Sequence, residues 1–271
     1  MNLIKESYRA KPSLGKVYIA DNFYKIALPI NTSASGKGID VMPTGTRLPI
    51  TGDYIRTFVH WENAFDIDSS LIMVRNDDIL EYLYFGNYHE KTYGNDILFS
   101  GDVTSKNGTE YYDIKLENMR KRGYKYIIST FHGFSSTLND GDIHCGYQNK
   151  DNLKTKAWDA KNIALKIHVK GETRAFAGFA IDLETKEIII LNQLRASSNQ
   201  VVSGSDYQTI KRYLVPSALG INFGLIASFR GEVVATPEEA DIVFDDSFVD
   251  LTENQQVIRS YQTEKLVTLI N

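Results

Sequence analysis

The chain has 271 residues, of which 42% are hydrophobic and 24% are charged, with a formal net charge of −4. This composition is typical of a globular protein with a proper core, and the acidic balance argues against nucleic acid as the main ligand. The only cysteine, Cys145, excludes an intramolecular disulfide. Because the first residues lack the apolar core of a signal peptide and no stretch approaches the roughly 18 apolar residues of a membrane span, we expect a cytoplasmic protein without a transmembrane segment.

The N-terminal part is expected to contain only short elements. The first dozen residues are predicted to form a loose arm, and strands are predicted over 16–20 and 24–30 around a turn at Asp21–Asn22. Residues 31–49 are rich in Ser, Thr, Gly and Pro, which is typical of a loop. This loop is longer than compact domains usually contain, so it could cover part of the molecule or dock on a partner.

The strongest pattern is a series of short apolar and aromatic segments between residues 54 and 193. In the first segment Ile55, Thr57 and Val59 share one face of a predicted strand, with polar and aromatic residues on the other. A polar loop is expected from about 135 to 156. Further strands are predicted over 65–74, 83–85, 97–99, 111–116, 124–131, 162–169, 175–182 and 187–193. Short strands at this spacing predict a mainly β fold, a sandwich of two packed sheets.

The C-terminal part changes character. Asp206 is predicted to cap a helix over 207–214, an apolar stretch follows over 218–229, and a short helical turn at 237–241 precedes a strand at 242–244. These elements predict a small α/β extension. The expected organisation is therefore an N-terminal arm with short strands and a loop (1–49), a β-sandwich (50–195) and a C-terminal helical or mixed extension (196–271).

Asp66 and Asp68 are the most informative polar residues. At positions i and i+2 of a strand they would stand side by side, where two like charges repel each other. A divalent cation removes that penalty, and Ca²⁺ prefers six to eight oxygen ligands. Asp102, Asn87 and Glu110 offer further oxygens at neighbouring strand ends. Alternatively, an Asp-x-Asp pair is simply part of a solvated face.

The residues around these acids occur in a recognisable order. Trp61-Glu62-Asn63 is followed by Phe65–Ser70, then by Tyr84-Phe85-Gly86-Asn87, and then by Phe99-Ser100-Gly101-Asp102. In this order and at these separations the chain resembles the TerD family of tellurite-resistance and stress proteins. The best-matching core covers about residues 54–132, with weaker similarity through to 193, and the flanking strand looks like longer, less characterised relatives.

The resemblance implies a TerD-like β-sandwich that binds Ca²⁺ through acidic loops, with no established catalysis. Carried onto this sequence, Asp66, Asp68 and Asp102 match acids of the motif, and Asn87 matches its Asn position. The chain also departs from the family pattern. The usual Gly-Asp-Asn is Gly101-Asp102-Val103 here, and the acid-rich stretch before the next strand is reduced to Gly108–Tyr111, which includes Glu110. We expect one weakened Ca²⁺ site or none, in place of paired sites.

The sequence nominates no catalytic apparatus. The five histidines show no metal-ligand spacing such as His-x₃-His, and Cys145 directly follows His144, so in a strand the two would face opposite ways. Asp140-Gly141-Asp142 with His144 could bind a metal, although a solvated turn is favoured. The basic segment 119–125 is interpreted as a solvated connection in preference to a phosphate-binding patch. We therefore expect that the chain is not an enzyme.

Two functions follow from these observations. The first is a non-catalytic module of the stress-response or tellurite-resistance type, which binds Ca²⁺ and mediates protein interactions. The alternative is a structural component of a larger assembly, such as a phage particle formed in the cytoplasm, that keeps the fold as a scaffold with a weakened or lost metal site. The reduced acids, the loop at 31–49 and the two terminal segments favour the alternative. Protein partners or self-assembly are expected under both.

Overall fold

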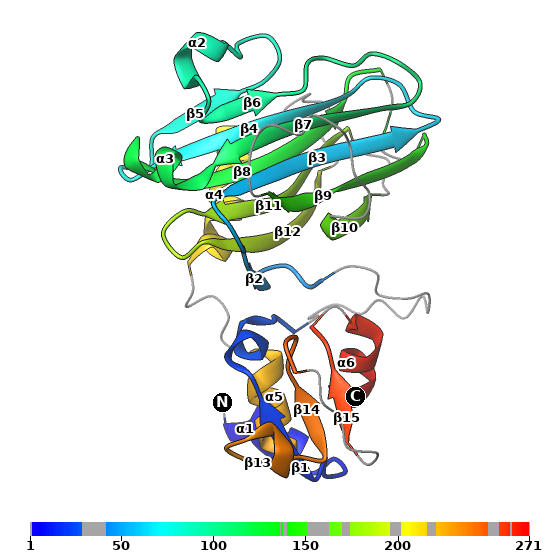
Figure 1. Cartoon of the computed structure of the whole chain (residues 1–271). Helices are drawn as coiled ribbons and strands as arrows, with labels where there is room; N and C mark the ends of the chain where they lie inside the picture. The colour runs from blue at the N-terminus through cyan, green and yellow to red at the C-terminus, as the bar shows by residue number, and fades with distance from the viewer. Residues whose placement is uncertain are drawn as a thin grey trace. The chain divides into compact units, whose positions relative to one another are not determined.

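The structure, a computed structural model, describes residues 2–28, 42–135, 137, 140–150, 163–169, 174–195, 202–215, 221–248, 255–260 and 262–270. The chain forms two compact units (Figure 1). The larger unit is contiguous and spans Pro49–Val215, whereas the smaller unit combines Met1–Leu48 with Pro216–Asn271. Residues 1–48 of the expected arm and 216–271 of the expected extension belong to the smaller unit, whereas 196–215 of that extension belong to the larger unit. No helix in the described ranges is both long and apolar enough to cross a membrane.

The larger unit is a sandwich of two sheets, so the predicted mainly β fold is confirmed. One sheet has the order β10 (Ile163–Val169), β9 (Asp142–Lys150), β3 (Tyr54–Glu62), β7 (Gly108–Lys115) and β6 (Ile97–Phe99). The other has the order β2 (Arg47–Pro49), β12 (Glu187–Arg195), β11 (Ala175–Asp182), β8 (Tyr124–Gly133), β4 (Ile67–Arg75) and β5 (Leu80–Leu83). Neighbouring strands from β10 to β6 and from β12 to β5 are antiparallel.

Alternation along the strands builds the core between the sheets. Along β3, Ile55, Val59 and Trp61 are fully buried, while His60 on the opposite face is half-buried. The ring of Tyr147 on β9 lies 6.0 Å from that of Phe179 on β11, so the two sheets meet through aromatic side chains. The division of faces predicted for the first strand places His60 outside this core. Burial does not alternate along β3, because Arg56 and Phe58 on the same face as His60 are also buried.

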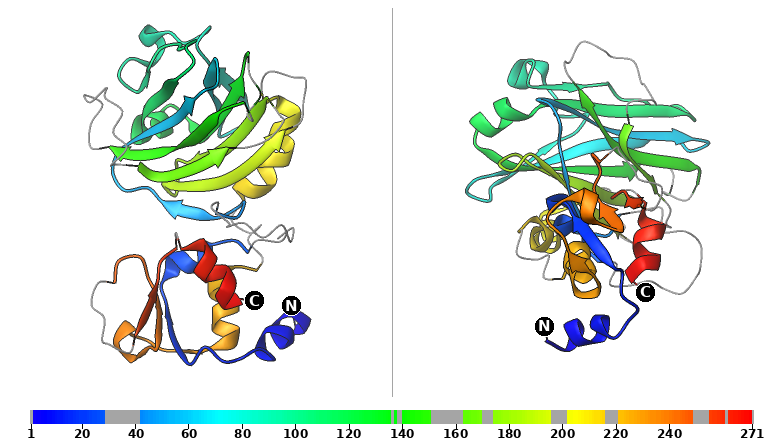
Figure 2. Two further views of the ribbon diagram at one scale, coloured as in Figure 1. Left: turned by 90° about the vertical axis from the view of Figure 1, so that its right-hand side faces the viewer. Right: turned by 60° about the horizontal axis from the view of Figure 1, so that its bottom comes forward.

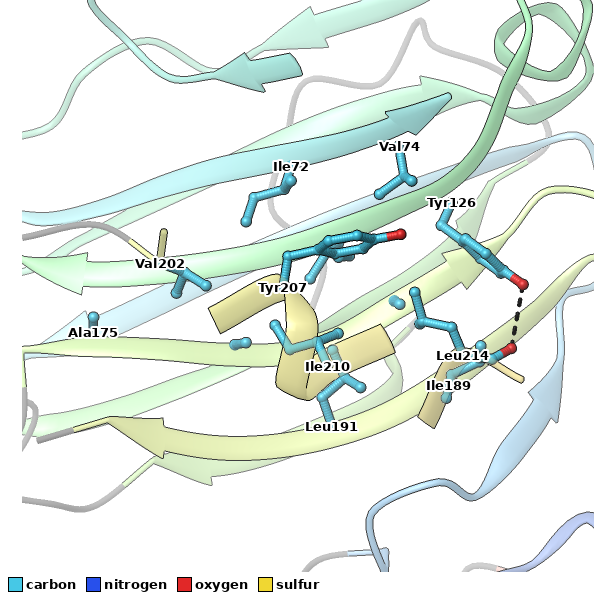
Figure 3. Close-up of a cluster of buried hydrophobic side chains, with 13 residues drawn as sticks. Ile72, Val74, Tyr126, Ala175, Ile189, Leu191, Val202, Tyr207, Ile210 and Leu214 are labelled. Atoms are coloured by element: carbon cyan, nitrogen blue, oxygen red, sulfur yellow. Dashed lines mark hydrogen bonds between the residues drawn. The ribbon is translucent and has the colours of Figure 1, made fainter. Parts of the chain in front are cut away.

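Helix α4 (Gly204–Leu214) covers the other face of the six-stranded sheet (Figure 3). Tyr207, Ile210 and Leu214 pack on side chains of β4, β8, β11 and β12, and the hydroxyl of Tyr126 donates to the Leu214 carbonyl at 3.2 Å. The helix was expected at this place, but Ser203 is its N-cap. Asp206 accepts a hydrogen bond from the Ser203 backbone nitrogen at 2.8 Å, as the third helical residue of a capping box does.

Two strands of these sheets were not predicted. Residues 47–49, expected to be the end of the loop at 31–49, form β2. Residues 142–150, expected to lie in a polar loop, form β9, whose buried Ile143, Cys145 and Tyr147 alternate with polar residues. The expectation was wrong because Gly and polar residues outnumber the apolar positions in this stretch. The other departures are smaller: β5 begins before the predicted 83–85, and the connection carrying the basic segment is helix α3 (Leu116–Lys121). A short helix, α2, spans Glu90–Tyr93.

The smaller unit is an α/β structure around a parallel sheet. The strand order is β13 (Glu232–Val233), β1 (Lys16–Ile19), β14 (Ile242–Phe244) and β15 (Gln256–Ile258). Its helices are α1 (Asn2–Arg9), the 3₁₀-helix η1 (Asp21–Lys25), α5 (Phe223–Arg230), the 3₁₀-helix η4 (Pro237–Glu239) and α6 (Thr263–Ile270). The described N-terminal and C-terminal segments both belong to this unit (Figure 2).

Three phenylalanines form the centre of the smaller unit. The rings of Phe23, Phe223 and Phe244 lie 5.3 to 6.1 Å apart, measured between centroids.

The loose arm and the strand expected over 24–30 are wrong where the structure describes them, because residues 2–9 form α1 and residues 21–25 form η1. The helical turn at 237–239 and the strand at 242–244 are confirmed. Residues 31–41 of the expected loop lie outside the described ranges.

Candidate metal centre

Three of the predicted ligands come together in the larger unit. Asp66, Asp68 and Asp102 each offer a carboxylate oxygen, and the three oxygens lie within 4.8 Å of one another. Two oxygens bound to one Ca²⁺ at about 2.4 Å can be at most about 4.8 Å apart. The three carboxylates, called the acidic cluster below, are therefore close enough to share one cation.

Turns, more than a shared strand face, bring these acids together. Asp66 precedes β4 and has a left-handed backbone, with φ 59°, and its carbonyl accepts a hydrogen bond from the backbone nitrogen of Phe134 at 2.9 Å. Asp68 is the second residue of β4. Asp102 follows Gly101, whose φ of 98° favours glycine. The expectation that Asp66 and Asp68 share one face of a strand is thus wrong for Asp66, although their side chains do meet.

Asp68 is the buried member of the cluster. The residue is 2% exposed, and its Oδ2 atom is buried without a hydrogen-bond partner in the described structure. Burial, together with the charges of Asp66 and Asp102, raises the pKa of Asp68 to about 7. The pKa of Asp66 is also raised, mainly by burial and then by Asp102. The arrangement is therefore unfavourable for three free anions.

His132 is a neighbour of the cluster that the sequence analysis did not identify. It lies directly opposite Asp68 on β8, and its Nε2 atom is 3.2 Å from Asp68 Oδ2 without the alignment of a hydrogen bond. Burial lowers the pKa of His132 to about 4, so a neutral imidazole faces the acids. The neutral ring of His132 therefore does not offset the negative charge of the carboxylates. This contact follows from the register of β4 and β8, which cannot be read from the sequence.

Glu110 supports the cluster from the opposite sheet. Its Oε2 accepts from the Ser69 backbone nitrogen at 2.8 Å and its Oε1 from the Val103 nitrogen at 2.9 Å. Strand β5 pairs only with Leu71–Val74, so the edge of β4 is open at Ser69 and the carboxylate satisfies it. Burial raises the pKa of Glu110 to about 8, against the lowering effect of these two bonds. Both oxygens of Glu110 accept hydrogen bonds from backbone nitrogens of residues adjacent to Asp68 and Asp102. Glu110 therefore positions these two acids.

Asn87 has a local use in the structure. Its Oδ1 accepts from the Tyr84 backbone nitrogen at 2.8 Å, and its Nδ2 donates to the Tyr82 carbonyl at 2.7 Å. The side chain thus closes the turn that follows β5, as Asn commonly does. The oxygen predicted to be a ligand is already engaged by the backbone.

The donor set of the acidic cluster fits a hard cation. Carboxylate oxygens are the preferred ligands of Ca²⁺, and the unpartnered Oδ2 of Asp68 is a buried acceptor that a cation would satisfy. Three carboxylates supply up to six oxygens if each binds through both, and fewer if waters complete the shell. Asp66, Asp68 and Asp102 are the residues that would hold the ion.

A second group of possible ligands lies on β9 and β10. Asp142, His144 and His168, called the histidine cluster below, offer one oxygen and two nitrogens within 4.8 Å of one another. Burial lowers the pKa of His144, and the hydrogen bond from His144 lowers the pKa of Asp142. The sequence analysis raised Asp142 and His144 as possible ligands but favoured a solvated turn. It missed His168 because it placed 142–150 in a loop, whereas pairing of β9 with β10 puts His144 opposite His168.

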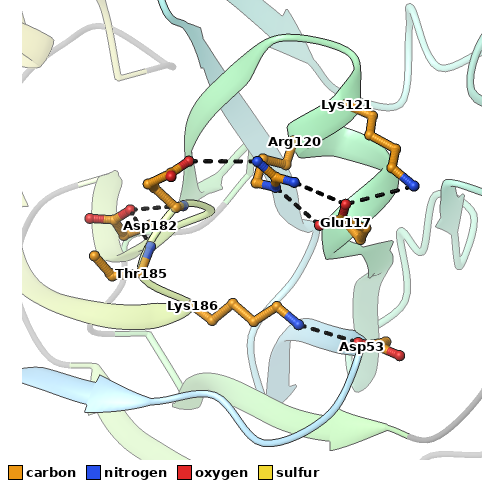
Figure 4. Close-up of polar contacts among 8 residues, drawn as sticks. Asp53, Glu117, Arg120, Lys121, Asp182, Thr185 and Lys186 are labelled. Carbon is orange, nitrogen blue, oxygen red and sulfur yellow. Dashed lines mark hydrogen bonds and ion pairs between the residues drawn. The ribbon is translucent and has the colours of Figure 1, made fainter.

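The basic segment 119–125 carries internal ion pairs. Arg120 binds Glu117 through Nε at 3.0 Å, and Lys121 Nζ lies 3.7 Å from the same carboxylate (Figure 4). Nearby, Lys186 Nζ lies 3.3 Å from Asp53 Oδ1. Glu117 thus pairs with both Arg120 and Lys121 of α3, which agrees with a solvated connection.

Comparisons with known proteins give little similarity. No protein-family model matches the chain, and no curated protein matches it. Among solved structures, the crystal structure of a homologue of telluride resistance protein (TerD) from Streptomyces coelicolor A3(2) is similar over 54% of this chain and 91% of that chain. The sequence identity is 9% and the TM-score is 0.42. Similarity of this size does not assign the chain to a family.

Proposed function

We propose that the chain is a non-catalytic binding module that takes up Ca²⁺ at the acidic cluster and then presents an apolar rim to a protein partner. The carboxylate of Asp68 carries this proposal. It is almost completely buried, one of its oxygens has no hydrogen-bond partner in the described structure, and two further carboxylates share its surroundings. A buried group of this kind is costly as a free anion, and a bound cation offsets that cost.

The rim consists of two exposed phenylalanines beside the cluster. Phe65 is 49% exposed and Phe134 is 50% exposed. Phe65 precedes Asp66 in the chain, and the backbone nitrogen of Phe134 donates to the Asp66 carbonyl. A cation that holds Asp66 therefore also fixes the backbone that carries both rings. Aromatic side chains are enriched at protein interfaces and often anchor them.

The resemblance to the TerD family adds a biological setting to this chemistry. A stress-response or tellurite-resistance role would then be exercised through binding of a partner, with the cation as the signal or as a structural support. The proposal includes one weakened site, because Glu110 and Asn87 spend their oxygens on backbone groups.

Calorimetric titration of the chelator-stripped full chain with Ca²⁺ tests the site. We expect saturable binding that Asp66→Asn/Asp68→Asn abolishes. Glu184→Gln is the matched control, because this carboxylate on the same unit is 72% exposed and its removal should leave Ca²⁺ affinity unchanged. Absence of binding by the parent at millimolar Ca²⁺ would reject the proposal. Self-association of that protein in sedimentation would then favour the structural-component alternative.

The rim has a separate test. Fluorescence of an apolar dye such as anilinonaphthalene sulfonate should rise on addition of Ca²⁺ to the parent. The variant Phe65→Ser/Phe134→Ser should bind Ca²⁺ with the affinity of the parent but show less of this rise. An equal rise in parent and variant would remove the two phenylalanines from the proposed interface.

A further inference from the structure

The histidine cluster lies on the face of the five-stranded sheet that points away from the sandwich core. His144 on β9 alternates with Ile143 and Cys145, which are fully buried between the sheets. His168 on β10 alternates in the same way with Ile167 and Val169. Both imidazoles therefore project from rigid, paired strands, at the edge of the sheet that β10 forms.

The two imidazoles converge on one carboxylate oxygen. Nε2 of His144 and Nε2 of His168 are each 3.0 Å from Asp142 Oδ1. The ring centroids are 4.8 Å apart with an interplanar angle of 32°, so the rings lie side by side and direct the same nitrogen to the same place. Nδ1 of His144 is buried without a hydrogen-bond partner in the described structure, which leaves Nε2 as its presented nitrogen.

The contact of His168 with Asp142 is short but does not form a hydrogen bond. Its Nε2 is buried and has no hydrogen-bond partner in the described residues, although Asp142 Oδ1 is only 3.0 Å away. Ligands of one ion show this relation, because each points at the metal and neither at the other. With metal–ligand distances of about 2.0–2.2 Å in a tetrahedral shell, neighbouring ligand atoms are about 3.3–3.6 Å apart, slightly more than the distance seen here.

We propose that Asp142, His144 and His168 form a binding site for a divalent transition-metal ion of the zinc type. Two imidazole nitrogens and one carboxylate oxygen suit Zn²⁺ and its transition-metal neighbours, whereas Ca²⁺ prefers oxygen alone. This ligand chemistry separates the site from the acidic cluster, and the inference does not depend on the proposed function.

Among the described residues the ligand set consists of three side chains, so water or an outside ligand would complete a four-coordinate shell. The next residue in the cross-strand row is His60, which lies opposite His144. Its Nδ1 is 2.7 Å from Thr109 Oγ1, and its Nε2 is 3.7 Å from Glu62 Oε1. An ion held by β9 and β10 would join the edge strand to the interior of the sheet.

The test uses the full chain purified without a polyhistidine tag and stripped of metal. Zn²⁺ is titrated by calorimetry, and Co²⁺ is titrated by visible absorption, because bound Co²⁺ reports nitrogen ligands and low coordination number. We expect one ion per chain, and more than tenfold weaker binding in His168→Gln and in Asp142→Asn, since loss of even a supporting contact costs roughly 10–100-fold. His89→Gln, a change of an exposed histidine, is the matched control.

Two measurements keep a folding defect from imitating the result. Asp142 has a side chain that is 55% exposed, so Asp142→Asn should fold as the parent does, which circular dichroism and thermal unfolding check. Asp66→Asn/Asp68→Asn should keep the parent's Zn²⁺ affinity. The inference is overturned if the parent shows no saturable Zn²⁺ binding, or if Asp142→Asn and His168→Gln bind Zn²⁺ as tightly as His89→Gln does.

Discussion

The acidic cluster and the histidine cluster solve the same problem, the gathering of ligands, in two different ways. The acids stand at the end of the sandwich, where a left-handed Asp66, the start of β4 and the loop after β6 meet. The histidines stand on paired strands, where the register alone sets their spacing. Loops allow several oxygens to adjust around a large cation, whereas strands fix a few ligands at short range.

Burial separates the two clusters further. Asp68 is closed off from solvent, and the backbone nitrogen of its neighbour Ser69 donates to Glu110, which ties the two sheets together at that end. Asp142 is more than half exposed, and its loss removes a ligand without opening the core. The acidic cluster is therefore built into the buried part of the sandwich, so its charges affect the stability of the fold. The second is attached to an architecture that is already complete.

The largest expected effect is that each cluster can lose its own metal without affecting binding of the other metal. Asp66→Asn/Asp68→Asn should lower Ca²⁺ affinity at least about 100-fold, or about 2.7 kcal/mol, and leave Zn²⁺ binding unchanged. His168→Gln should do the reverse. Parallel calorimetric titrations of both variants with both ions measure this. If each variant weakened the binding of both ions, the two clusters would be one coupled site and not two independent ones.

Glu110→Gln should give the next largest effect, on stability. The amide keeps one acceptor for the backbone nitrogens of Ser69 and Val103 and turns a donor toward the other, which costs about 1–3 kcal/mol in a buried place. Urea unfolding at about pH 9, above the Glu110 pKa of about 8, measures the loss, with Glu184→Gln as the charge-matched control. A loss below about 0.5 kcal/mol would mean that the carboxylate is not a structural link.

Metal-free stability should depend on pH through the same end of the sandwich. The pKa values of Asp68 and Glu110 in the folded chain, about 7 and about 8, lie above the ordinary values of 3.8 and 4.5. The folded state thus binds more protons than the unfolded state between these limits. The free energy of unfolding should fall as pH rises from about 5 to 8, by at most ~1.4 kcal/mol per unit for each carboxyl.

Chemical unfolding at a series of pH values, with chelator present, measures this slope. Asp68→Asn should flatten it and should be more stable than the metal-free parent at pH 8, although it no longer binds Ca²⁺. The same slope in parent and Asp68→Asn would show that the carboxyl of Asp68 titrates normally in the folded chain.

The smallest expected effect is that of Asp142→Asn without metal. Because the carboxylate is largely exposed, the free energy of unfolding should change by no more than about 0.5 kcal/mol. Thermal unfolding of chelator-treated protein tests this, and added Zn²⁺ should raise the melting temperature of the parent more than that of the variant. A large loss without metal would make Asp142 a structural residue and weaken the contrast between the clusters.

The sequence predicts the sandwich well because the period of two is strong wherever apolar residues fill the inward positions. It also identifies Asp66, Asp68 and Asp102, since short separations and neighbouring strand ends limit where these acids can lie. The sequence raises Asp142 and His144 as possible ligands, but Gly146 and polar residues obscure the pattern of their strand, so the complete cluster around His144 is not predicted. Its partner comes from another strand, and strand pairing is a long-range property that a single sequence does not state.

Strand β1 has a consequence for how the protein is made. It lies between β13 and β14 and pairs with both, yet these two strands belong to the far end of the chain. During synthesis on the ribosome, β1 emerges before the sandwich and cannot pair with β13 and β14 until the residues of the sandwich have been translated. The contiguous sandwich can fold in the meantime, so we expect the parallel sheet to be completed last and to depend on an N-terminal segment kept from aggregating.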